Sequence, residues 1–185
     1  LSAGGFVMNR GMVEHYAPAL LRCNLPIGNA GDTGSGILMG QGMGAAVSNM
    51  HEGFVSLPFY PPSSLTYGIF VNAQGQRFIN EDCYHGRVGA HVLRQPEGPI
   101  YLILNVEDYG NYETRSYLGA SVAATGESVA ELTAELGLPD GQLEQTIARY
   151  NAGAESGEDP NAPRVETQQP IENRGGSARY MIQGG

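Results

Sequence analysis

GIFVNAQGQRFINED, residues 68–82, is the most informative stretch of this sequence. Residues 69–71 form a short run of β-branched and aromatic side chains, and residues 72–75 (NAQG) are typical of a tight connection. Residues 77–79 then return as a second short run. The pattern predicts a β-hairpin that is followed by a turn into a polar segment.

The sequence on the C-terminal side of the hairpin predicts three helices and one strand. The expected elements are a helix within residues 83–95, a strand at 100–104, a helix from 128 to 136 and a helix over 140–151. Val88, His91 and Val92 share one face of the first helix, and Ser128 with Glu131 predicts a capping box. A polar, proline-rich loop is expected over residues 153–169.

The N-terminal side predicts a second group of elements. They are a helix over residues 12–21, a glycine-rich loop at 29–36, a helix over 37–48 and a strand at 54–57. Gly40, Gly42 and Gly44 lie in the second helix, and glycine lets a helix backbone approach its neighbour closely. We therefore expect this helix to be tightly packed. The predicted fold class is α+β.

Composition excludes several classes of function. The chain has 185 residues and a formal net charge of −9, and its basic residues are scattered singly, which argues against a nucleic-acid partner. No apolar run approaches the length of about 20 residues that a transmembrane helix needs. Cys23 and Cys83 show no CxxC spacing and no nearby histidine cluster, so we expect two reduced thiols and no metal site.

Neither end of the sequence looks like the end of a domain. The chain begins LSAGG without an initiator methionine and finishes MIQGG, so both ends are expected to be cut from a longer polypeptide. A bacterial cytoplasmic location is expected.

Five segments, in order, carry a resemblance to a known family. They are LSAGGFVMN at residues 1–9, the glycine loop and helix at 31–46, the hairpin at 68–81, IYLILNVED at 100–108 and the helix pair at 125–151. Together they resemble the fumarate reductase/3-ketosteroid dehydrogenase flavoproteins. The sequence of residues 80–84, Asn-Glu-Asp-Cys-Tyr, is most similar to the Δ4-(5α)-dehydrogenase type.

The resemblance implies a domain organisation and a cofactor. It divides the chain into a partial FAD-binding domain (1–50), a capping or substrate domain (51–165) and a segment that returns to the FAD domain (166–185). FAD is the implied cofactor, with contacts from the glycine loop and the first turn: Gly4, Gly5, Gly31, Asp32 and Gly34. Asp32 has the alternative role of starting a helix. A GxGxxG fingerprint is absent, so the isolated chain is expected to bind FAD poorly and to be inactive.

The resemblance also implies a substrate class. In the fumarate-reducing branch, an arginine that acts as general acid follows four residues after the glutamate of the Asn-Glu pair. In this sequence that position is His85. Aromatic and apolar residues stand in place of the other cationic side chains that bind the substrate in that branch. A pocket lined by such residues suits a bulky neutral ketone better than a small dianion. We expect Tyr84 to assist proton removal, while Tyr60, Tyr67 and His85 contact a steroid-like ketone. The missing remainder of the FAD domain is the implied partner.

Other interpretations remain open. Tyr84 has a structural alternative, Arg77 is expected to pair with a local carboxylate, and Glu81 and Asp82 are expected to organise the turn through backbone N–H groups. The alternative to steroid desaturation within enzymes is the reduction of an unsaturated acid such as fumarate or urocanate. A non-catalytic binding module is the alternative outside enzymes.

Overall fold

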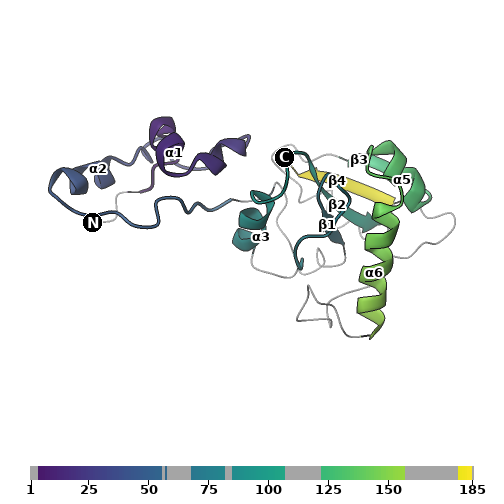
Figure 1. Ribbon diagram of the computed structural model, residues 1–185. Coiled ribbons are helices and arrows are strands. Elements are labelled where there is room, and N and C mark those ends of the chain that lie inside the picture. The colour runs from purple at the N-terminus through teal and green to yellow at the C-terminus, as the bar shows by residue number, and fades with distance from the viewer. Residues whose placement is uncertain are drawn as a thin grey trace. The chain divides into compact units, whose positions relative to one another are not determined.

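The computed structural model describes residues 4–55, 57, 68–81, 85–106, 122–156 and 179–184 (Figure 1). The chain divides into two compact units, Leu1–Val55 and Ser56–Gly185. The division lies close to the expected boundary at residue 50, and assigning the units to an FAD domain and a capping domain stays a prediction. Each unit is described by itself below.

The first unit contains a pair of consecutive helices near its beginning. Helix α1 spans Arg10–Tyr16, and the Asn9 side chain caps it by accepting a hydrogen bond from the N–H of Met12 at 3.1 Å. The 3-10 helix η1 follows at Pro18–Arg22. Proline has no backbone N–H to continue an α-helix, so the single helix predicted over residues 12–21 is divided at this point.

Helix α2 spans Ser35–Gly42 and is shorter than predicted. The sequence analysis extended this helix to residue 48, but Gly44 adopts a left-handed φ of +88°, a conformation that terminates helices. The expected tight packing is also wrong for the described residues, where α2 has no buried residue and Met39 is 70% exposed.

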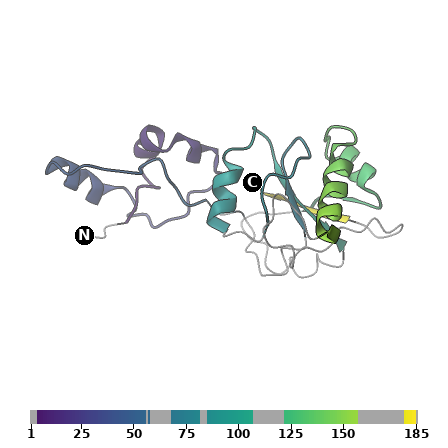
Figure 2. The ribbon, with the colours of Figure 1, turned by 60° about the horizontal axis from the view of Figure 1, so that its bottom comes forward.

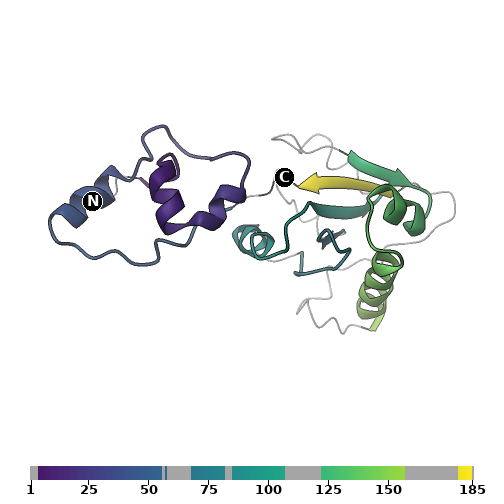
Figure 3. The same ribbon diagram turned by 45° about the horizontal axis from the view of Figure 1, so that its top comes forward.

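The second unit is built on a four-stranded antiparallel sheet. The strands are β1 (Ile69–Val71), β2 (Ile100–Asn105), β3 (Val122–Gly126) and β4 (Arg179–Gly184), in the spatial order β1-β2-β4-β3 (Figure 3). The last strand in the sequence therefore lies inside the sheet, where it pairs with β2 over its whole length. A register shift between Val122 and Thr125 interrupts the pairing of β3 with β4.

Helices cover both faces of this sheet. Helix α3 (His85–Val92) lies on one side, and α5 (Val129–Glu135) and α6 (Gln142–Ser156) lie on the other (Figure 2). Alternate residues of β1 and β2 supply the two cores, as the period of two in a strand requires. One core joins Ile69, Val71, Tyr101 and Ile103 to α5 and α6, and the other joins Phe70, Ile100, Leu102 and Leu104 to Val88 of α3.

Several predicted elements of this unit are confirmed. Strand β2, helix α3 and the α5–α6 pair lie where the sequence placed them, and the mixed α and β class is as predicted. Ser128 caps α5 by accepting a hydrogen bond from the N–H of Glu131 at 3.2 Å. The Glu131 carboxylate in turn accepts from the N–H of Glu127 at 2.7 Å, one residue before the position that a standard capping box uses.

The structure corrects three predictions of local structure and adds one strand. The second strand of the hairpin at 77–79 reduces to one bridge between Val71 and Arg77, and β1 pairs with β2 instead. The described residues 54, 55 and 57 form no strand. Residues 153–156 belong to α6, and the rest of the predicted loop lies outside the described residues. Strand β3 was not predicted, and its last two residues fall at the start of the segment 125–151 that was assigned to the helix pair.

No helix in the described part of the chain is long and apolar enough to cross a membrane.

Candidate functional site

The turn after β1 is fixed mainly by the side chain of Asn72. Its Oδ1 atom accepts hydrogen bonds from the N–H groups of Gln74 and Gln76 at 3.0 and 3.1 Å, and Asn72 is only 3% exposed. Gly75 supplies the left-handed φ of +70° that the turn requires. The predicted tight connection is therefore confirmed, and its geometry follows from an asparagine and a glycine at the correct spacing.

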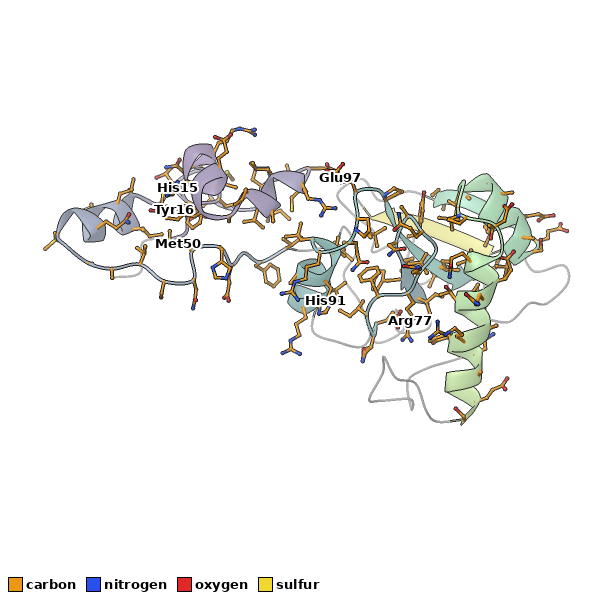
Figure 4. All side chains as sticks on the ribbon, viewed as in Figure 1. His15, Tyr16, Met50, Arg77, His91 and Glu97 are labelled. Atoms are coloured by element: carbon orange, nitrogen blue, oxygen red, sulfur yellow. The ribbon has the colours of Figure 1, made fainter. Side chains whose placement is uncertain are left out.

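Arg77, which is labelled in Figure 4, forms a buried ion pair with Glu81 directly after this turn. Nη2 of Arg77 lies 2.6 Å from Oε2 of Glu81, and Nε lies 2.9 Å from Oε1, which makes the contact bidentate. Their side chains are only 6% and 4% exposed. The expected pairing of Arg77 with a local carboxylate is thus confirmed.

The Glu81 carboxylate also holds the backbone of β1. Oε1 accepts a hydrogen bond from the N–H of Phe70 at 3.0 Å, so Glu81 organises the chain through a backbone N–H as predicted. Burial raises the pKa of Glu81, whereas the Arg77 guanidinium and the Phe70 N–H act in the opposite direction. All of these described partners are donors, which is the arrangement that suits an ionised carboxylate.

Helix α6 packs against this segment through two residues that sequence reasoning missed. The guanidinium carbon of Arg77 lies 4.9 Å from the ring centroid of Tyr150, within the range of a cation–π contact. Oγ1 of Thr146 donates to the carbonyl oxygen of Gly75 at 2.7 Å. Both residues lie about 70 positions away in the sequence, so no local pattern could have indicated them.

The predicted substrate-binding residues are placed only in part. Tyr60, Tyr67 and Tyr84 lie outside the described residues. His85 is the first residue of α3, and its side chain also lies outside the described part of the structure. Their roles stay predictions.

The first unit brings the five predicted cofactor residues together. The turn at 29–32 is closed by Asp32, whose Oδ2 atom accepts from the N–H of Asn29 at 2.8 Å. Its carbonyl oxygen accepts from the N–H of Met8 at 3.0 Å, and the N–H of Gly34 donates to the carbonyl of Gly5 at 2.9 Å. Asp32 therefore joins two loop segments and does not cap α2, whose N-cap is Gly34.

The glycines of this cluster differ in backbone conformation and in the space available for a side chain. Gly4 and Gly34 have φ values of +76° and +75°, and a Cβ at Gly4 would collide with Asp32 while one at Gly34 would collide with Met12. Gly5 has a negative φ and no heavy atom within 4 Å of its Cβ position in the described structure. Gly31 donates its N–H to Oδ1 of Asn29 at 3.0 Å.

The described residues contain no group of three or more His, Cys, Asp or Glu side chains that could hold a metal ion.

A family model described as an FAD binding domain matches residues 1–183 of this chain. The chain therefore belongs to this family of FAD binding domains. The match confirms the resemblance drawn from the five segments, and FAD is the cofactor of the family.

Similar proteins fall into two groups by name. A 3-oxosteroid 1-dehydrogenase of Mycobacterium tuberculosis is 29% identical over 90% of this chain and 35% of its own length. A fumarate reductase (cytochrome) of Shewanella frigidimarina is 29% identical over 89% of this chain and 31% of its own length. The chain thus spans about a third of the length of these relatives.

A solved structure has a similar fold. The 3-ketosteroid-Δ4-(5α)-dehydrogenase of Rhodococcus jostii RHA1, in complex with 4-androstene-3,17-dione, superposes with a TM-score of 0.78 and 30% identity. The match covers 97% of this chain and 37% of that one.

Proposed function

We propose that the chain is the substrate-capping part, with flanking portions of the FAD domain, of an oxidoreductase that desaturates a 3-ketosteroid. In this assignment residues 1–50 belong to the FAD domain, residues 51–165 form the capping domain and residues 166–185 return to the FAD domain. The reaction class is CH–CH dehydrogenation.

The observation that carries the proposal is the burial of Arg77 and its pairing with Glu81. Arg77 is the cation of the hairpin motif, yet its side chain is buried and engaged by Glu81, so it is not presented to a substrate carboxylate. His85 stands where the fumarate-reducing branch has its arginine. A dianionic substrate needs cationic partners when it leaves water, whereas a neutral ketone does not. The name of the similar Rhodococcus jostii protein, which was solved with a steroid, supports the same direction.

Reduction of an unsaturated acid is the second candidate. The Shewanella frigidimarina fumarate reductase is as similar in sequence to this chain as the Mycobacterium tuberculosis steroid dehydrogenase is. Fumarate or urocanate is then the class of substrate. A non-catalytic binding module is the remaining alternative.

The described glycine cluster fits a bound FAD at one position. Gly5 has open space at its Cβ position, and a backbone without a side chain is what close approach to a ligand requires. Gly4, Gly34 and Asp32 would hold the two loop segments together around it, and Gly31 would continue the loop. When bound, FAD supplies a hydride acceptor at its N5 atom.

The residues of the chain supply the proton chemistry and the binding of the ketone. Tyr84 is proposed to take the proton from the carbon next to the one that loses hydride, directly or through a relay. Tyr60, Tyr67 and His85 are proposed to contact the steroid, and a hydrogen-bond donor among them would polarise the C3 carbonyl.

The test measures flavin absorbance and dye-linked oxidation of 4-androstene-3,17-dione by the purified gene product. Steroid-dependent bleaching of the flavin, with no reduction of fumarate by reduced dye, is the expected result. Reduction of fumarate without steroid turnover would replace the proposed reaction by the second candidate. A flavin-free protein that binds steroid without turnover would favour the binding module.

Replacing Tyr84 tests the proposed proton transfer. Tyr84→Phe should lower kcat by about a hundredfold or more, in line with the contribution of general acid–base catalysis. The matched control is Tyr101→Phe, which removes a phenol from the buried core of β2 and should leave kcat within about twofold. Equal turnover by Tyr84→Phe and the wild type would exclude Tyr84 from proton transfer.

A further inference from the structure

The Arg77–Glu81 pair is an unusual choice if its only task is stability. Both side chains leave water almost completely, and the desolvation of two charges offsets much of their attraction. Well-packed apolar side chains at such positions are often as stabilising as a buried pair. What the pair does provide is geometry, because a bidentate guanidinium–carboxylate contact fixes both distance and orientation.

The pair fixes one point of the chain against β1. Glu81 is tied to the backbone of Phe70 at 3.0 Å and to Arg77 by three hydrogen bonds. Arg77 is in turn fixed from two sides, by the bridge to Val71 and by the ring of Tyr150. Glu81 lies four residues before His85, where α3 begins, so its position restricts where the helix can start.

The other end of α3 is tied to the same strand. Nδ2 of Asn72 donates to Oε1 of Gln95 at 3.0 Å, and Nε2 of Gln95 donates to the carbonyl of His91 at 3.1 Å. Asn72 follows β1 directly, two residues after Phe70. Polar contacts therefore fix the chain near both ends of helix α3 to β1 and the adjoining turn: Glu81 before the helix and Gln95 after it. Val88 is buried in the core between these two contacts.

We propose that the Arg77–Glu81 pair is a positioning device that sets the start of α3, and with it His85, relative to β1. The catalytic consequence rests on the proposed function, since His85 is a proposed contact of the substrate. The structural part, that the pair holds α3 in place, does not depend on the reaction.

Amide hydrogen exchange tests the structural part without any substrate. Glu81→Gln keeps the shape of the side chain and an acceptor for Phe70 but removes the charge that holds Arg77. Exchange over residues 86–92 should accelerate by about tenfold or more, while exchange over 142–156 changes by less than about threefold. Leu132→Ala is the matched control, because it weakens the core on the opposite face of the sheet and should accelerate 142–156 preferentially.

The outcomes separate positioning from general stability. Acceleration confined to 86–92 supports the proposal, and either uniform acceleration or no change over 86–92 overturns it. If Glu81→Gln does not fold, Arg77→Lys decides in its place, because lysine keeps the charge and loses the bidentate fork. The same regional contrast, smaller in size, is then expected, and its absence overturns the proposal.

Steroid kinetics test the catalytic consequence. Glu81→Gln should lower kcat/KM by about tenfold, mainly through KM, at a temperature where it is fully folded, whereas Leu132→Ala should stay within about twofold. A regional exchange effect with unchanged kcat/KM would overturn the link to substrate. If the wild type does not oxidise steroids, the proposed function fails, and the exchange result still decides the positioning role.

Discussion

The hydrogen bond between Thr146 and Gly75 should make a measurable contribution to stability, because it joins α6 to the turn after β1. Oγ1 of Thr146 lies 2.7 Å from the carbonyl oxygen of Gly75, and Thr146 is 8% exposed. Thr146→Val removes the hydroxyl and keeps the size and β-branching of the side chain. The substitution therefore isolates one donor.

The expected loss follows from what the substitution leaves behind. A net hydrogen bond contributes about 0.5–1.5 kcal/mol, and leaving a buried acceptor unpaired costs about 1–3 kcal/mol. Threonine and valine have similar helix propensities, so the backbone adds little. We expect the free energy of unfolding to fall by about 1–2 kcal/mol, which corresponds to a fall in Tm of about 2–8 °C for a chain of this size.

Urea unfolding followed by circular dichroism measures this loss, and an unchanged m value shows that the same surface is exposed on unfolding. Thr133→Val is the matched control, because Oγ1 of Thr133 donates to the carbonyl of Val129 within its own helix at 2.9 Å. The control should lose less than about 1 kcal/mol, since its shorter bond lies within its own helix and its contact with Oε2 of Glu144 on α6 is longer, at 3.3 Å. An equal or smaller loss in Thr146→Val would refute the reasoning.

Three further changes have expected outcomes. Gly34→Ala should lower the free energy of unfolding of the first unit by about 1–3 kcal/mol in urea titrations, because φ is +75° and Phe6 lies 2.8 Å from the new Cβ, and unchanged stability would contradict this. Leu132→Ala should cost about 2–5 kcal/mol by the same assay, since the side chain is fully buried, and a loss below about 1 kcal/mol would argue against that packing. Burial raises the pKa of Cys23, so less of it is thiolate at neutral pH. In a Cys83→Ser background it should react with a disulfide reagent more slowly than free cysteine and accelerate as pH rises, and a rate equal to free cysteine at pH 7 would exclude the shift.

Features specified by neighbouring residues were predictable from the sequence. The turn at 72–75 follows from Asn72 and Gly75, the start of α5 follows from Ser128 and Glu131, and α6 follows from the spacing of its apolar residues. In each case the partner lies within a few positions. Local hydrogen bonds and periodicity are therefore sufficient to specify these elements.

Features that depend on distant partners were not predictable. Strand β3 consists of small and polar residues and is defined by its pairing with β4, more than 50 residues away. Residues 77–79 have the composition of a strand, but Arg77 turns inward to Glu81, so pairing with β1 stops after one bridge. The contact of Arg77 with Tyr150 depends on how α6 packs against the sheet. Tertiary packing decides these cases, and strand propensity is a weak guide to them.

The strand order β1-β2-β4-β3 has a consequence for folding during synthesis on the ribosome. Strands β1 and β2 can pair early, but β3 has β4 as its only neighbour in the described sheet, and β4 begins at residue 179. A nascent chain must therefore carry β3, and one open edge of β2, unpaired until nearly all of these 185 residues have emerged. Pairing across so long a separation is slow, and unpaired edges invite association. The strand order therefore leaves β3 and one edge of β2 as the parts of this sheet that stay open to association longest during synthesis.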